Sequence, residues 1–141
     1  MAGVLHKGMV IFLSGDLGAG KTTLARGVLR GLGHAGRVKS PTFSLVEVYE
    51  LSSLYFYHFD FYRFGNPDEW RNAGLQEYFN PEAICLVEWP EKAMGLPVPD
   101  VVVRLAPDGD GRSAELEAHT EVGRECLERL ASAEHDRTRQ H

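Results

Sequence analysis

The chain has 141 residues, enough for one domain with a modest core, and its formal net charge of -5 argues against a broad nucleic-acid-binding face. Its hydrophobic content of 43% is that of an ordinary globular protein, and no apolar run approaches the ~20 residues of a membrane span. Cys85 and Cys126 lack metal-ligand spacing, so we expect free thiols in a reducing cytoplasm. We predict a single domain over residues 1–133 and a polar, disordered tail over 134–141.

The first predicted elements are a strand, a glycine-rich loop and a helix. Residues 9–13 form a short apolar run without alternation, which is typical of a strand buried on both faces of a parallel sheet. Glycines are frequent from Gly15 to Gly20. Residues 21–32 then carry apolar side chains at helical spacing, with Gly33 as the expected stop. A phosphate-binding loop requires these elements in this order.

The glycine-rich loop matches the Walker A pattern at every defined position. Glycines let the backbone approach phosphates closely, and the following helix adds the partial positive charge of its N-terminus. We expect Lys21 to contact the β- and γ-phosphates of ATP, Thr22 to bind Mg²⁺ and Thr23 to reach the α-phosphate. A glycine turn without a ligand is the alternative. The predicted nucleotide-binding segment is Gly15, Asp16, Leu17, Gly18, Ala19, Gly20, Lys21, Thr22 and Thr23.

Further strands and helices follow in the remainder of the chain. Aromatic and branched residues predict a hairpin over 43–49 and 54–61, a central strand over 83–87 and a later edge hairpin over 100–106 and 112–118. Asn66 is a predicted N-cap with Pro67 at the first helical position, and Thr120 is the predicted cap of a helix over about 121–130. We expect a three-layer α/β P-loop NTPase fold, with a mostly parallel central sheet and antiparallel edge strands.

Two acidic residues are candidates for holding the metal and orienting water. Glu88 comes at the carboxyl end of the apolar strand, where a Walker B acid belongs, although a solvated glutamate is the alternative. Asp60 lies between aromatic residues, where a charge is costly unless it is paired or bound to metal; pairing with an arginine is its alternative. Strand alternation places His58, Asp60 and Tyr62 on one face. A histidine in this position is as often a hydrogen-bonded structural residue as a functional one.

Thr42 belongs to a Ser-Pro-Thr-Phe segment that follows the predicted helix. In P-loop proteins this zone often supplies a hydroxyl that senses the γ-phosphate. Thr42 is therefore predicted either as such a switch residue or as part of a turn before the next strand.

Four motifs in this order make the chain resemble the bacterial TsaE (YjeE) family, from about residue 9 to 118. They lie at residues 15–23, 40–43, 58–63 and 87–91. The resemblance implies a P-loop ATPase needed for N6-threonylcarbamoyladenosine in tRNAs that read ANN codons. It also implies binding to the TsaB–TsaD heterodimer, contact with tRNA through that complex, and ATP hydrolysis that supports turnover of the transferase.

The family pattern implies a role for each matching residue. Lys21, Asp60 and Glu88 would be catalytic, and Thr22 would hold magnesium together with Asp60 and Glu88. Loop amides would bind the phosphates of ATP.

Three further positions take roles from the same resemblance. Thr42 would be the switch hydroxyl, and Trp89 would lie beside the site. Arg112 opens the strand after the last hairpin turn and would reach the nucleotide or a partner. The chain departs from the family pattern in having only residues 1–8 before its first predicted strand, where members usually carry a further helix.

Two other functions compete with this prediction. A small-molecule P-loop kinase would share the first elements but usually adds an arginine-rich lid, for which residues 63–71 are too short. A nucleotide-dependent binding module would use ATP only as a conformational ligand. The guanine-reading motif of GTPases is missing from the sequence, which favours ATP.

Overall fold

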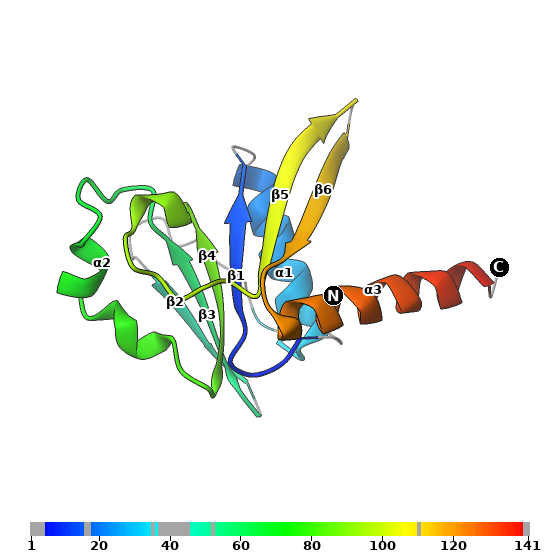
Figure 1. Cartoon of the computed structure of the whole chain (residues 1–141), viewed down its shortest axis with the longest axis horizontal. Helices are drawn as coiled ribbons and strands as arrows, with labels where there is room; N and C mark the ends of the chain where they lie inside the picture. Colours follow the sequence, from blue (N-terminus) through cyan, green and yellow to red (C-terminus); the bar gives the residue numbers. More distant parts are fainter. Residues whose placement is uncertain are drawn as a thin grey trace.

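The computed structural model describes residues 5–15, 18–34, 36, 46–51, 53–109 and 111–139, with the side chains of 18–22, 108, 111–112 and 133–139 excepted. Its strands and helices follow the predicted order (Figure 1). They are β1 (Val10–Ser14), α1 (Gly18–Gly31), β2 (Val46–Glu50), β3 (Tyr55–Asp60), α2 (Glu69–Asn72), η2 (Leu75–Tyr78), β4 (Ala83–Glu88), η3 (Pro90–Lys92), β5 (Val101–Asp108), β6 (Gly111–Ala118) and α3 (Glu121–Arg139).

The strands form one six-stranded sheet in the order β2-β3-β4-β1-β5-β6. The four inner strands are parallel, because β1 pairs in parallel with β4 and β5, and β3 pairs in parallel with β4. The outer strands β2 and β6 are antiparallel to β3 and β5. This topology confirms the predicted α/β fold with a mostly parallel sheet and antiparallel edges.

Helices cover both faces of the sheet. On one face, α1 and the start of α3 pack through Ala25, Val28, Leu29 and Cys126 against side chains of the inner strands. The opposite face is rich in aromatic residues and is covered by α2 and η2. Figure 1 shows α1 behind the sheet, while α3 leads away from it toward the C-terminus. In the described part of the chain, no helix is long and apolar enough to cross a membrane.

Two predicted helix ends are confirmed by their hydrogen bonds. After α1, Gly33 has a φ of 101°, and the amides of Gly33 and His34 donate to the carbonyl oxygens of Arg30 and Leu29. This pattern is a Schellman motif, in which glycine relieves the strain of the left-handed position. At the start of α3, the Thr120 hydroxyl accepts from the Gly123 amide at 3.0 Å, as expected of an N-cap.

Two helices begin at other residues than predicted. Helix α1 begins at Gly18 rather than Lys21, inside the glycine-rich loop. Helix α2 begins at Glu69 rather than Pro67, because the Asn66 side chain accepts from the Asp68 amide and closes a turn before the helix.

The last helix is also longer than predicted. Helix α3 runs to Arg139 instead of ending near Leu130, so the segment from 134 that we expected to be disordered is helical as far as Arg139. The sequence of α3 is rich in glutamate and arginine, which favour helix without packing.

Candidate functional site

The carboxyl ends of β1, β3 and β4 meet at one edge of the sheet, since these neighbouring strands are parallel. The two predicted acids end their strands directly opposite each other, with Asp60 paired with Glu88 in the register of β3 and β4. Glu88 is also paired with Leu13 of β1, whose strand leads into the Walker A segment. The structure therefore brings both acids beside the start of the predicted phosphate loop.

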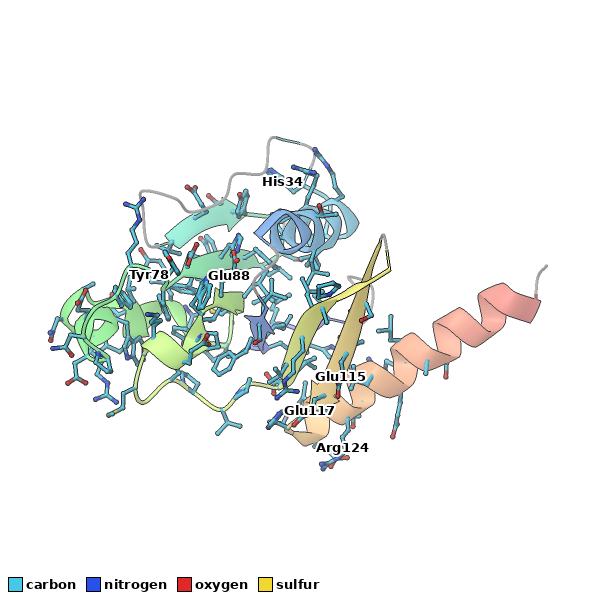
Figure 2. All side chains as sticks on the ribbon, turned by 90° about the horizontal axis from the view of Figure 1, so that it is seen from above. His34, Tyr78, Glu88, Glu115, Glu117 and Arg124 are labelled. Atoms are coloured by element: carbon cyan, nitrogen blue, oxygen red, sulfur yellow. The ribbon has the colours of Figure 1, made fainter. Side chains whose placement is uncertain are left out.

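These acids lie on the face of the sheet that α1 covers. Phe56 of β3 and Leu86 of β4 pack in the same core cluster as the inner side of α1. Side chains alternate along a strand, so His58, Asp60 and Glu88 project to this face as well. Glu88 is only 5% exposed and lies inside the fold rather than at its rim (Figure 2).

Gly15 fixes how the chain leaves β1. Its φ is 124°, and a Cβ atom at this position would lie 2.6 Å from the carbonyl oxygen of Leu105 in β5. No other residue fits there without moving the backbone of the neighbouring strand. The first glycine of the Walker A pattern is thus explained by packing against β5, in addition to any approach to phosphate.

The remainder of the Walker A segment is only partly described. Asp16 and Leu17 lie outside the described residues, while the backbone from Gly18 to Thr22 forms the first turns of α1. The N-terminus of this helix follows β1 at the edge where the acids lie. Its free amides and partial positive charge favour an anion at that point. Thr23 is exposed on α1, and the contacts of Lys21 and Thr22 with ATP and magnesium stay predictions.

Glu88 makes a short contact with His58. The His58 Nε2 atom lies 2.5 Å from Oε2 of Glu88, and the two residues are 0% and 5% exposed. The other ring nitrogen of His58, Nδ1, is buried and has no hydrogen-bond partner among the residues that the structure describes. The sequence left His58 between a structural and a functional role, and its pairing with Glu88 was not predicted. The available signal was its position two residues before Asp60, on the same strand face.

Asp60 is held at the point where β3 turns away from the sheet. Its Oδ1 accepts from the Tyr62 amide at 3.0 Å. The Tyr62 ring, which was not predicted as a site residue, lies 5.1 Å from the Trp89 ring. Trp89 has a φ of 58°, the one positive value among the described non-glycine residues, so the chain turns sharply directly after Glu88.

Two predicted site residues are not placed at this edge. Thr42 lies outside the described residues. The backbone of Arg112 pairs with Pro107 in the β5–β6 hairpin, beyond residues 101–104 that pair with β1. Figure 1 shows this hairpin projecting past the end of β1. The side chain of Arg112 is not described, and its contact with a nucleotide or partner stays a prediction.

The described side chains do not form a metal site by themselves. Within the described ranges, no group of three or more histidine, cysteine or acidic side chains could hold a metal ion. Magnesium differs from calcium and zinc in that it is usually held by one or two carboxylates together with water and substrate phosphates. Asp60 and Glu88 beside a helix N-terminus fit that mode of binding.

A comparison with protein families matches residues 1–115 to the model of "Threonylcarbamoyl adenosine biosynthesis protein TsaE". Curated relatives carry the description "tRNA threonylcarbamoyladenosine biosynthesis protein TsaE". The chain is similar to the Haemophilus influenzae protein, with 48% identity over 123 residues, 86% of this chain and 78% of the relative. The Bacillus subtilis protein is 49% identical over 82 residues, 58% of this chain and 51% of the relative. For Treponema pallidum the identity is 38%, over 77% of this chain and 80% of the relative.

Among solved structures, the crystal structure of Bacillus subtilis YdiB is similar to this chain. The TM-score is 0.74 and the sequence identity 31%, over 94% of this chain and 83% of the other. The similarity of the fold therefore extends across nearly the whole chain.

Proposed function

The chain belongs to the TsaE family of tRNA threonylcarbamoyladenosine biosynthesis proteins, and on that premise we propose that it is a magnesium-dependent P-loop ATPase. The observation that carries the proposal is the position of Asp60 and Glu88, which lie opposite each other in the backbone register at the ends of the adjacent parallel strands β3 and β4. This pair stands beside β1, the strand that leads into a complete Walker A sequence and helix α1. A phosphate-binding loop needs acids in this position to hold magnesium and orient water.

The roles of the site residues follow from their chemistry. Loop amides from Gly15 to Gly20 and the Lys21 ammonium would bind the phosphates of ATP, and the Thr22 hydroxyl would hold magnesium together with the acids. Magnesium, when bound, would neutralise the charge that develops on the phosphates during hydrolysis. Glu88 would orient the attacking water from a buried position, where electrostatic effects are stronger than in bulk water.

We further propose that this activity serves the modification of tRNAs that read ANN codons. The chain would act as an accessory subunit in the cytoplasm, binding TsaB and TsaD and supporting turnover of their transferase. Contact with tRNA would be indirect, which agrees with a formal net charge of -5. Thr42 and Arg112 are candidates for sensing the nucleotide or a partner.

The proposal is tested by ATP hydrolysis of the purified chain, alone and with TsaB–TsaD. We expect slow turnover alone, stimulation by the partners, and loss of both nucleotide binding and turnover in Lys21→Ala. Glu88→Gln should keep nucleotide binding but lower kcat about 100-fold or more, as removal of a positioned electrostatic group does.

Three outcomes would contradict this proposal. Unchanged turnover in Glu88→Gln would remove the catalytic role of that residue. Tight ATP binding without hydrolysis would leave a nucleotide-dependent binding module. A phosphorylated product from a panel of metabolites would indicate a kinase instead.

A further inference from the structure

His58 and Glu88 form an almost completely buried pair that the proposed mechanism does not yet use. Their atoms Nε2 and Oε2 are 2.5 Å apart, well within the distance of a direct hydrogen bond. The histidine is 0% and the glutamate 5% exposed. A carboxylate removed from water in this way is strongly destabilising unless a donor compensates it. His58 provides that donor.

The strand geometry explains why the pair forms. In the register of β3 and β4, His58 is opposite Leu86, while Glu88 is opposite Asp60. His58 and Glu88 are therefore diagonal neighbours on one face, a separation that a long side chain can span. Both backbones are fixed by the parallel ladder. The direction of the Glu88 side chain is thus set by a neighbour on a rigid element rather than by a loop.

We propose that His58 is a positioning residue for Glu88 in ATP hydrolysis. This inference rests on the proposed ATPase function and deepens it. With Oε2 bound to His58, the rotation of the Glu88 carboxylate is restricted, and His58 would thereby set its orientation toward the attacking water. Fixing such a group within a fraction of an ångström matters because small misplacements reduce catalytic rates strongly.

Within the described part of the chain, Nδ1 of His58 is buried without a hydrogen-bond partner, and this supports a dedicated role for the residue. Burial of a polar atom without a partner costs free energy, so a histidine kept only for packing would be replaced by an apolar residue at lower cost. The hydrogen bond of its other ring nitrogen, Nε2, is directed at the acid with the predicted catalytic role.

The test uses substitutions that distinguish the hydrogen-bond donor of His58 from the space that its side chain fills. His58→Leu removes the donor and keeps an apolar side chain, whereas His58→Gln keeps an N–H donor near the position of Nε2. We expect His58→Leu to lower kcat about 10- to 100-fold, the range found when a supporting partner is removed. The affinity for Mg-ATP, measured by nucleotide fluorescence, should change by less than about twofold, because the substitution acts on the chemical step and not on the binding of the substrate. His58→Gln should recover most of the lost turnover.

Two controls make the result specific. His119→Leu removes a histidine that pairs with Glu117 near the surface, at the junction of β6 and α3, and should leave kcat unchanged. In a Glu88→Gln background, His58→Leu should add little further loss, since both changes act through the same carboxylate.

The possible results distinguish the positioning role from the proposed function. Should the wild type neither bind nor hydrolyse ATP, the ATPase proposal fails and the positioning role falls with it. If the wild type is active and His58→Leu keeps its kcat or exceeds it, only the positioning role is overturned. Should His58→Leu fail to fold, His58→Gln is compared with His58→Asn, whose amide is too short to reach Glu88; equal kcat values for these two variants would overturn the inference.

Discussion

Burial changes the chemistry of individual side chains, and Cys85 shows how far. This residue is 1% exposed in β4, and its Sγ donates to the carbonyl oxygen of Tyr78 at 3.3 Å. Burial raises the pKa of the Cys85 thiol to about 12, because the thiolate would lose its hydration. In the unfolded chain a cysteine has a pKa of about 8.5. Between these two pKa values, the thiol of Cys85 therefore keeps its proton in the folded chain and loses it in the unfolded chain.

The raised pKa of Cys85 predicts a loss of stability at alkaline pH. Below about pH 8.5 both states keep the proton, and Cys85 adds no pH dependence. Above it the unfolded chain loses the proton while the folded chain retains it, so the free energy of unfolding should fall by up to about 1.4 kcal/mol per pH unit. Urea unfolding from pH 8 to 10.5 measures this slope. Cys85→Ala should flatten it, and parallel curves for the two proteins would contradict the prediction.

At the scale of elements, contacts between helix and sheet decide what each helix position tolerates. The carboxylate of Asp100 accepts from the Val10 amide at 2.8 Å and from the Thr120 hydroxyl at 2.7 Å. It thereby joins the start of β1 to the N-cap of α3. Gly123, in the first turn of α3, lies against the same region, and a Cβ atom there would be 1.9 Å from the carbonyl oxygen of Asp100. By contrast, a Cβ atom added at Gly27 of α1 would meet no described atom within 4 Å beyond the neighbouring backbone of its own helix.

These two glycines should respond in opposite ways to the same substitution. Gly27→Ala should raise the free energy of unfolding by up to about 1 kcal/mol, because alanine loses less backbone entropy in a helix. Gly123→Ala should lower it by about 1–3 kcal/mol, because the added methyl group must displace the backbone of Asp100. Chemical denaturation of both variants measures the difference. A stabilised Gly123→Ala protein would mean that α3 does not pack against the start of β5 in this way.

On the scale of the whole molecule, the site depends on elements that are distant in the sequence. β1, β3 and β4 contribute one edge, and β5 closes the space next to Gly15. A ligand that binds across this edge should stabilise the entire domain, because it binds the folded chain and has no site in the unfolded one.

We expect Mg-ATP at 100 times its dissociation constant to raise the free energy of unfolding by about 2.7 kcal/mol. Thermal unfolding with and without the nucleotide measures the effect. Chelation of magnesium should reduce the shift, and Lys21→Ala should abolish it at the same nucleotide concentration. An equal shift in Lys21→Ala would place the bound nucleotide somewhere other than the predicted loop.

The sequence by itself determined the order and type of most strands and helices. Apolar runs without alternation identified β1 and β4, since strands of a parallel sheet are buried on both faces. Capping by Thr120 and the stop at Gly33 were local signals, because they depend on hydrogen bonds between residues close in the chain. Asp60 and Glu88 were also predicted from local patterns. Asp60 is a charged residue between aromatic residues, and Glu88 is an acid at the carboxyl end of an apolar strand.

Only the tertiary structure decided which side chains meet. The bond between His58 and Glu88 joins residues on different strands, and their distance depends on the register of β3 with β4, which no local pattern encodes. Likewise, the contact of Gly15 with Leu105 arises because β5 returns beside β1 after most of the chain has passed. Local propensity selects helix or strand, whereas pairing across the sheet brings distant residues within reach of one another.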